Sequence, residues 1–249
     1  MIMKWMFLLS LVTVGSLAFL KPGEVEKPEP VAVIELFTSQ GCSSCPAADR
    51  LLSKTISNLN TKDPKILALS FHVDYWNHLG WADPFSDKAY TRRQYEYAKV
   101  FHSKSVYTPQ MVINGTREIV GSNEANLKNA LQEAAKRTPV TTFEILNAKI
   151  EDGNLLKVKY ALAGDYQGCK VNFALVSRHE TTPIKRGENG GKTLTSDNVV
   201  RQFIRVDPKQ SGEVLFNPTT LKRENMAVIA YVQKQTDYQI VGAARTEIH

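Results

Sequence analysis

"VAVIELFTSQGCSSCPAADRLL", at residues 31 to 52, combines the three features that decide the expected fold. It begins with a continuous apolar run, which is typical of a strand buried on both faces. The cysteine pair Cys42 and Cys45 follows with Cys-x-x-Cys spacing. From Pro46 onward, apolar residues recur at helical spacing, which predicts an amphipathic helix. A cysteine pair in this position has three interpretations: a redox pair, half of a metal site, or a structural disulfide.

The residues that follow predict more helices and strands in alternation. A second buried strand is expected at 65–73, and a helix at 87–101. A hairpin is expected around Asn114-Gly115, a dipeptide that suits a type I′ turn. Asn123 can then cap a last helix that carries one apolar stripe. This order of elements is typical of an α/β domain.

The same stretch resembles the thioredoxins over roughly residues 31 to 137. Its Cys-x-x-Cys opens a helix after a buried strand, and Thr108-Pro109 opens the hairpin where thioredoxins have a cis proline. The resemblance implies a cis bond at Thr108-Pro109 that faces Cys42. "SFHVDYW", "YTPQMVING" and "GENGGKTLTSDNVVR" are similar, more closely, to an exported bacterial thioredoxin-like family known only as a domain of unknown function. That family carries a C-terminal β domain, so the closer resemblance spans nearly the whole chain.

A position at the start of a helix gives the two cysteines different expected roles. Backbone N–H groups and the helix dipole favour a thiolate at Cys42, and such sites can lower a cysteine pKa from about 8.5 to about 3.5–7.5. Cys45, one turn inside the helix, can attack a mixed disulfide on Cys42. Ser43 and Ser44 are uncharged, and no carboxylate is near in the sequence before Asp49. We therefore favour a redox pair over a structural disulfide.

The third cysteine limits the metal-site interpretation. Cys169 is the only other cysteine in the chain, so a site of four cysteines is excluded within one chain. Cys169 shares its alternation with Val171, Phe173 and Leu175, so we expect it to face a core as a spectator.

An aromatic-rich segment at 71–85 leaves the second strand at the sheet edge where the cysteines are expected. If His72 and Asp74 lie close to the cysteines, His72 can stabilise the thiolate or accept a proton, and with both sulfurs it can bind copper or zinc. His78 is expected to be partly exposed and Trp81 to pack within the loop. The candidate catalytic residues are therefore Cys42, Cys45, Thr108, Pro109, His72 and Asp74.

The pattern of the chain changes beyond Pro139. Short alternating runs separated by Gly, Asn, Asp or Pro predict strands. We predict an α/β thioredoxin-like domain at 31–139, followed by an all-β antiparallel sandwich domain at 140–249. One loop contains Gly191-Lys192-Thr193, but Arg186 stands where a phosphate-binding loop requires glycine. Nucleotide binding is therefore rejected.

The N-terminus predicts export. Residues 1–18 have Lys4, a long uncharged run and small residues at the end, as in a cleaved signal peptide. Residues 19–30 are rich in Pro, Glu and Lys and predict an extended linker. We therefore expect a periplasmic or extracellular protein, with membrane association only through an uncleaved N-terminus. The net charge is +6 but is spread along the chain, so nucleic acid is not an expected partner.

The leading functional hypothesis is a thiol–disulfide oxidoreductase of the cell envelope that needs no cofactor. Cys42 would be the nucleophile and Cys45 the resolving thiol, with exported protein thiols or disulfides, or a redox partner protein, as reactants. Two alternatives stay open. One is a non-catalytic binding module with a structural disulfide, and the other is a copper protein that uses Cys42, Cys45 and His72.

Overall fold

A computed structural model describes residues 29–57, 65–151, 153–218 and 221–248. The predicted signal peptide and residues 19–28 of the predicted linker lie outside the described residues. The first part of the chain has the expected alternation of elements. Its helices and strands are β1 (Val31–Thr38), α1 (Cys45–Ser57), β2 (Lys65–His72), α2 (Lys88–Val100), β3 (Gln110–Ile113), β4 (Arg117–Val120) and α3 (Glu124–Ala134).

Local chemistry fixes the ends of these elements, as the sequence predicted. The Asp87 carboxylate accepts a hydrogen bond from Ala89 N at the start of α2, and the Asn123 side chain accepts one from Asn126 N at the start of α3. The β3–β4 turn places Asn114 and Gly115 at positive φ, 47° and 73°. A side chain at Gly115 would collide with the backbone carbonyl of Tyr238, so this turn is also a site of close approach.

The second part of the chain is made of strands at the positions where alternating runs were predicted. They are β5 (Thr141–Glu151), β6 (Leu155–Gly164), β7 (Cys169–Pro183), β8 (Thr193–Val206), β9 (Ser211–Phe216), β10 (Met226–Lys234) and β11 (Ile240–Glu247), with a short 3₁₀ helix, η1 (Arg223–Asn225), before β10.

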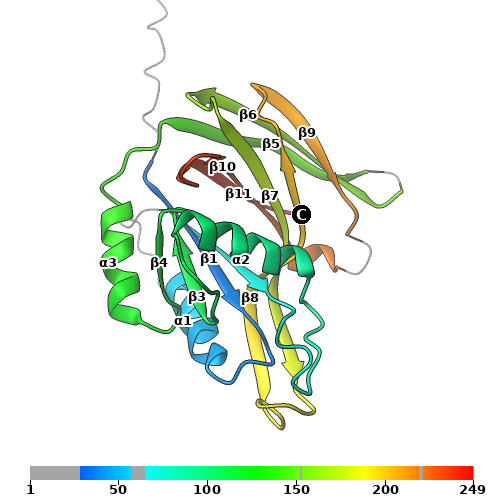
Figure 1. Cartoon of the computed structure of the whole chain (residues 1–249). Coiled ribbons are helices and arrows are strands. Elements are labelled where there is room, and N and C mark those ends of the chain that lie inside the picture. Colours follow the sequence, from blue (N-terminus) through cyan, green and yellow to red (C-terminus); the bar gives the residue numbers. More distant parts are fainter. Residues whose placement is uncertain (1–28, 58–64, 152, 219–220, 249) are drawn as a thin grey trace, which may run out of the picture.

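The architecture differs from the predicted one. The prediction of an α/β thioredoxin-like domain followed by an all-β antiparallel sandwich domain is wrong, because the protein is mostly β and is built on one mixed sheet of eight strands. The strand order is β11-β10-β7-β8-β2-β1-β3-β4, and β8 runs parallel to β2 where Val199 is paired with Ser70 (Figure 1). The strands β5, β6 and β9 form a separate sheet of three strands.

The strands β7 and β10 join the large sheet because both of their faces are apolar. On β7, Phe173 and Leu175 face the three-stranded sheet, whereas Ala174 and Val176 belong to a different core beneath α2. A strand of a free-standing sandwich would expose one of these faces to water. The eight-stranded sheet thus contains strands from both sides of the predicted boundary at 139/140. The division of the chain into two domains at that boundary stays a prediction.

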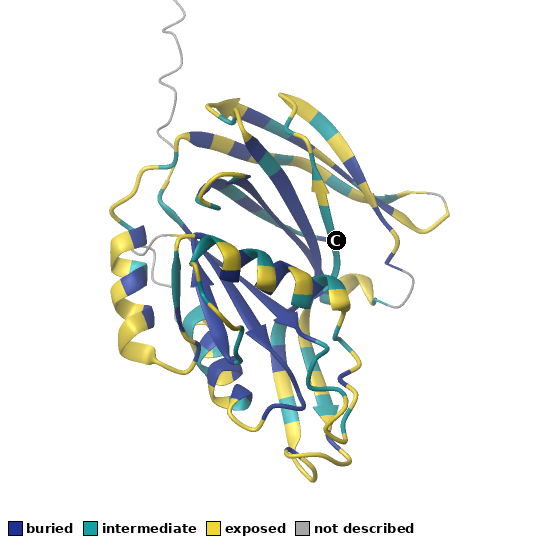
Figure 2. Ribbon diagram, viewed as in Figure 1, coloured by how far each residue is buried: buried dark blue, intermediate teal, exposed yellow. Residues whose placement is uncertain are grey.

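Helices and the small sheet cover the large sheet on both faces. The helix α2 contributes Tyr90 and Tyr97 to the core on one face. On the other face, α1 and α3 pack over the β1–β3 half, and β5, β6 and β9 pack over the β7–β10 half. Figure 2 shows the resulting pattern, in which the central strands β1 and β2 of the large sheet are buried and the outer sides of the helices are exposed. Within the described residues, no helix has both the length and the apolar character needed to span a bilayer.

A buried ion pair beneath α2 ties the two parts of the chain together. Arg93 of α2 donates to both carboxylate oxygens of Glu35 on β1, at 2.5 and 2.8 Å. The same guanidinium donates to the hydroxyl of Tyr231 and to Oε1 of Gln233, both on β10. Arg93 and Glu35 are only 3% and 0% exposed, so water does not solvate either charge. Each charge is stabilised by its partner instead.

Candidate redox site

The cysteine pair lies in the loop that joins β1 to α1. Cys42 and Cys45 form a disulfide, and their Cα atoms are 5.4 Å apart. Cys45 is the first residue of α1, so the helix begins one turn later than predicted and Cys42 lies in the turn before it. Both residues are 0% exposed. An attacking thiolate therefore cannot reach the disulfide unless a neighbouring segment moves.

The predicted proline faces the disulfide. The Thr108-Pro109 bond is cis, as expected, and the Cys42 Sγ lies 3.9 Å from the backbone carbonyl oxygen of Thr108. Trp76 fixes this segment by donating from its indole Nε1 to Thr108 Oγ1 at 2.8 Å. A Cβ atom at Gly121 would lie only 3.1 Å from Pro109 Cβ and 3.2 Å from Ala48 Cβ of α1, so glycine at this position permits close packing around Pro109.

A buried carboxylate lies one helical turn beyond Cys45. Asp49 is the fourth residue after Cys45 on α1, so the two side chains share a face of the helix. Its Oδ2 accepts a hydrogen bond from Thr38 Oγ1 at 3.0 Å, whereas its Oδ1 is fully buried without a hydrogen-bond partner among the described residues. Burial raises the pKa of Asp49 to about 6, although the positive charge of His72 and the Thr38 hydrogen bond both act to lower it.

The predicted candidate His72 belongs to the same buried cluster. It ends β2 directly beside Thr38, and its Nδ1 lies 2.7 Å from Oδ2 of Asp83. Burial opposes the charged imidazole, but Asp83 outweighs this effect and raises the pKa of His72. Burial likewise opposes the Asp83 carboxylate, and the pKa of Asp83 is nevertheless lowered by His72 and by backbone N–H donors. Both shifts favour an imidazolium–carboxylate pair, in which His72 Nδ1–H donates to Asp83.

The other side chains of the aromatic-rich segment have different roles. Asp74 does not join the buried cluster; its Oδ1 accepts from Thr91 Oγ1 at 2.5 Å and holds the segment against α2. His78 is exposed, where partial exposure was expected. Trp81 does more than the predicted loop packing, because its Nε1 donates to the side chain of Gln40, two residues before Cys42, at 3.1 Å.

A loop from the second part of the chain covers the cysteine loop. This cover loop, residues 184–192, joins β7 to β8, and Figure 1 shows that hairpin tip at the end of the molecule where β1 leads into α1. Asn189 is 0% exposed, and its Nδ2 donates to the backbone carbonyls of both Gln40 and Cys42 at 2.9 Å. The neighbouring Glu188 accepts a hydrogen bond from Ser43 N at 3.0 Å.

Glu188 changes the expected electrostatics of Cys42. The sequence predicted no carboxylate near the pair before Asp49, but the fold brings the Glu188 side chain onto a backbone N–H beside Cys42. That N–H is one of the donors that would otherwise stabilise a thiolate. In the closed arrangement the site therefore favours the disulfide or a protonated thiol more than the sequence suggested.

A family model described as a protein of unknown function, DUF1223, matches residues 33–233. The chain belongs to the DUF1223 family. A crystal structure of a protein from Agrobacterium tumefaciens is similar, with 27% identity, a TM-score of 0.67, and coverage of 89% of this chain and 96% of that one. HBP35 of Porphyromonas gingivalis shares the fold, with 14% identity, a TM-score of 0.66, and coverage of 89% and 76%. No curated protein matches the chain.

The described residues offer no preformed site for copper. Within the described parts of this DUF1223 protein, no group of three or more His, Cys, Asp or Glu side chains is arranged to hold a metal ion. His72 Nδ1 is engaged with Asp83, and both sulfurs are engaged with each other. A copper site that uses Cys42, Cys45 and His72 would first require reduction of the disulfide.

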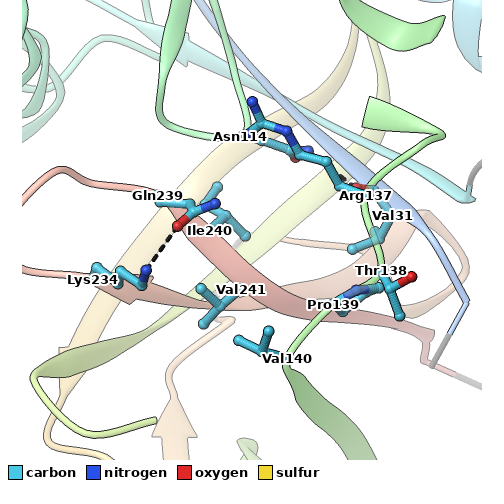
Figure 3. Close-up of a pocket in the computed structure, with 10 residues that line it drawn as sticks. All are labelled: Val31, Asn114, Arg137, Thr138, Pro139, Val140, Lys234, Gln239, Ile240 and Val241. Atoms are coloured by element: carbon cyan, nitrogen blue, oxygen red, sulfur yellow. Dashed lines mark hydrogen bonds between the residues drawn. The ribbon is translucent and has the colours of Figure 1, made fainter. Parts of the chain in front are cut away.

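A separate pocket lies at the opposite end of β1 from the cysteines. It is bounded by Val31, the first residue of β1, together with Asn114, Arg137 and Lys234 (Figure 3). Lys234 Nζ donates to the side chain of Gln239 at 2.8 Å, and Asn114 holds the β1 backbone. The ten residues that line this pocket include no thiol and no carboxylate, so they offer no group for the chemistry of the cysteine pair.

Sequence reasoning missed four members of the DUF1223 site, and one of them carried a signal. Asp49 is an acid on the apolar face of a predicted helix, four residues after Cys45, and that spacing places both side chains on the same helix face. Asp83, Glu188 and Asn189 reach the cysteine loop across long sequence separations, and nothing in their local sequence indicates those contacts.

Proposed function

We propose that this DUF1223 protein is a thiol–disulfide oxidoreductase of the cell envelope. The single observation that carries the proposal is the juxtaposition of the Cys42 sulfur with the carbonyl of Thr108 in the cis Thr108-Pro109 segment. It brings a Cys-x-x-Cys disulfide at the start of a helix next to the backbone of Thr108. A substrate chain that binds along this backbone would lie beside the reacting sulfur.

The proposed reaction is a two-step exchange with a protein dithiol. A substrate thiolate attacks Cys42 Sγ, the Cys42–Cys45 bond breaks, and Cys45 leaves as a thiolate. The second substrate thiolate then attacks the substrate sulfur of the mixed disulfide, and Cys42 leaves. The substrate gains a disulfide and loses two electrons, which this protein holds as two reduced cysteines. A redox partner protein with its own disulfide restores the starting state, and the reverse sequence reduces a substrate disulfide.

Export and a relation to the thioredoxins belong to the same proposal. The N-terminal signal pattern supports export, and an exported protein meets both disulfides and thiols in folding clients. The relation to the thioredoxins is supported by two local features, the cysteine pair before α1 and the cis proline beside it. This relation concerns the residues of the site alone. The architecture of the whole chain is the mixed eight-stranded sheet with its separate three-stranded sheet.

Trapping of mixed disulfides tests this function. In a Cys169→Ser background, Cys45→Ala leaves Cys42 without its resolving partner, so mixed disulfides with exported proteins should accumulate. Cys42→Ala is the matched control, which retains one cysteine of the pair but should trap nothing. The covalent complexes would be isolated after acid quenching and alkylation, and identified by mass spectrometry. Equal trapping by both variants, or by neither, contradicts the proposal.

One observation favours a non-catalytic binding module as the second candidate. Both cysteines are buried, and the cover loop is hydrogen-bonded to the Cys42 backbone through Asn189. In this second candidate, the disulfide has the single role of stiffening the loop between β1 and α1. This candidate predicts that neither cysteine variant traps a protein, and that a stable complex with an exported protein survives replacement of both cysteines.

A further inference from the structure

The pocket at the far end of β1 from the cysteines has two positive side chains in its wall. Figure 3 shows Lys234 of β10 and Arg137, which follows α3, on opposite sides of it. Its volume is about 80 Å³, whereas one water needs only about 10–15 Å³, so the cavity has room for one small ion. The ten described residues that line it include no carboxylate, so the pocket favours an anion.

The acids nearest to these two cations are engaged with other groups. Glu133 accepts a hydrogen bond from Arg117 Nη1 at 2.5 Å, and this bond is the largest cause that lowers the pKa of Glu133, while the Arg137 charge is a smaller one. Asp237 Oδ1 accepts from Gln239 N at 3.0 Å. The Lys234 ammonium donates to a neutral group, the side-chain amide of Gln239. Both positive charges can therefore act on a ligand.

Hydrogen bonds between two turns fix the shape of the pocket before any ligand enters. The backbone carbonyl of Asn114 in the β3–β4 turn accepts from Ile240 N at 3.0 Å, and Lys234 N donates to Gln239 O across the β10–β11 turn at 3.0 Å. Because Gln239 Oε1 accepts from Lys234 Nζ, the Nε2 group of Gln239 remains as a donor for a ligand. Groups that are already held in place lose little conformational entropy when a ligand binds.

The remaining wall of the pocket is apolar and partly uncovered. Val140 is 58% exposed, although it lines the same pocket as the buried side chains of Ile240 and Val241. A ligand with a short apolar tail removes part of Val140 from water, which is favourable. An inorganic anion gains nothing from this wall. The pocket therefore combines contacts for a negative charge with contacts for a small apolar group.

We propose that this pocket binds a small carboxylate with a short apolar tail, with Arg137 and Lys234 as its charged contacts and Val140 against the tail. A guanidinium suits a carboxylate because it can donate two parallel hydrogen bonds to it. The site lies apart from the cysteine pair, so the inference goes beyond the proposed function. Two sources offer this chemistry: a short-chain fatty acid, and the C-terminus of a peptide that ends in an apolar residue.

Titration of the ¹⁵N-labelled full chain with butyrate tests the proposal by NMR. Butyrate should give saturable shifts at the backbone amides of Gln239 and Val241, and butyramide, its neutral counterpart, should give none. Arg137→Gln and Lys234→Gln each remove one charged donor, so each should weaken butyrate binding by about 10-fold. Lys159→Gln is the matched control, since Lys159 is an exposed lysine on β6 outside the pocket and its loss should leave the affinity unchanged.

A second pair of ligands tests the apolar wall. Butyrate has two more methylene groups than acetate, so it should bind up to about 15-fold more tightly, and Val140→Ser should reduce that difference. Butyramide binding as tightly as butyrate, equal affinities for acetate and butyrate, or full affinity in both charge variants overturns the proposal.

A short peptide that ends in valine, and the same peptide with a C-terminal amide, distinguish the two sources. Tighter binding of the free-acid peptide than of butyrate supports the site and identifies a peptide C-terminus as its ligand. Weaker binding of that peptide, with butyrate bound, supports the site and identifies a short-chain carboxylate. None of these measurements involves a cysteine, so their failure leaves the mixed-disulfide test of the oxidoreductase function unaffected.

Discussion

Asn189 should control how readily the disulfide is reduced. Its side-chain amide donates to two backbone carbonyls of the cysteine loop, those of Gln40 and Cys42, and it is fully buried. Both cysteines are inaccessible while the cover loop is closed. Reduction therefore passes through an open state in which these two hydrogen bonds are broken. Asn189→Ala removes them from the closed state only, so it raises the population of the open state.

The size of the effect follows from the two bonds. A hydrogen bond contributes about 0.5–1.5 kcal/mol net, so the closed state should lose about 1–3 kcal/mol relative to the open one. Since 1.4 kcal/mol corresponds to a factor of ten, the open population should rise about 5- to 140-fold. When opening and closing are fast compared with reduction, the observed rate rises by the same factor.

The assay measures the second-order rate of disulfide reduction by dithiothreitol at fixed pH. Lys185→Ala is the matched control, because Lys185 is an exposed side chain on the same loop and its loss should leave the rate unchanged. Near-ultraviolet circular dichroism confirms that the variants are folded. An Asn189→Ala rate equal to that of wild type would show that the cover loop does not limit access, and would refute the reasoning.

Three further predictions concern stability and reactivity. Glu35→Gln leaves the Arg93 charge buried without its partner, so the free energy of unfolding in urea should fall by about 3–5 kcal/mol, whereas an unchanged midpoint would contradict the buried pair. Burial raises the pKa of the Cys169 thiol, whereas opening of the cover loop exposes Cys42, so in reduced protein iodoacetamide should label Cys42 first and Cys169 only after unfolding; labelling of Cys169 in the folded protein would contradict its position in the core. Burial raises the pKa of Asp49 from 3.8 to about 6, so the folded chain binds this proton more tightly than the unfolded chain and loses stability as pH rises from about 4 to 6. Asp49→Asn should therefore gain up to about 3 kcal/mol on wild type across that interval in urea titrations, and a constant difference would argue against the burial of Asp49.

Much of the local structure could be predicted because it depends on neighbours in the chain. Asp87 and Asn123 cap helices through N–H groups two or three residues away. The Asn114-Gly115 turn needs only the positive φ angles that these residues tolerate. Cys169 faces a core because alternation along a strand puts every second side chain on one face. Each of these inferences required no knowledge of the rest of the fold.

The assembly of the strands could not be predicted in the same way. Short strands with turn residues between them predicted a sandwich, and the strands are present, but alternation alone does not say which strand is paired with which. The continuous apolar runs around Ala174 and Ile229 were the available signal, since they indicate strands covered on both faces. The strands β8 and β2 are paired at one position, Ser70 with Val199. Nothing in the local sequence of either strand indicates this pairing.

The same limit applies to the site, and it has a chemical consequence. The cysteines and Pro109 were predicted from local motifs, but the groups that bury and tune them come from residues 83, 188 and 189. Glu188 and Asn189 are adjacent, so movement of the cover loop away from Cys42 breaks the Asn189 bonds and withdraws the Glu188 carboxylate together. The Ser43 N–H is then free to donate to a thiolate, and the negative charge of Glu188 is withdrawn from the residue next to Cys42. Access to Cys42 and stabilisation of its thiolate therefore arise from one displacement, and a closed loop opposes both.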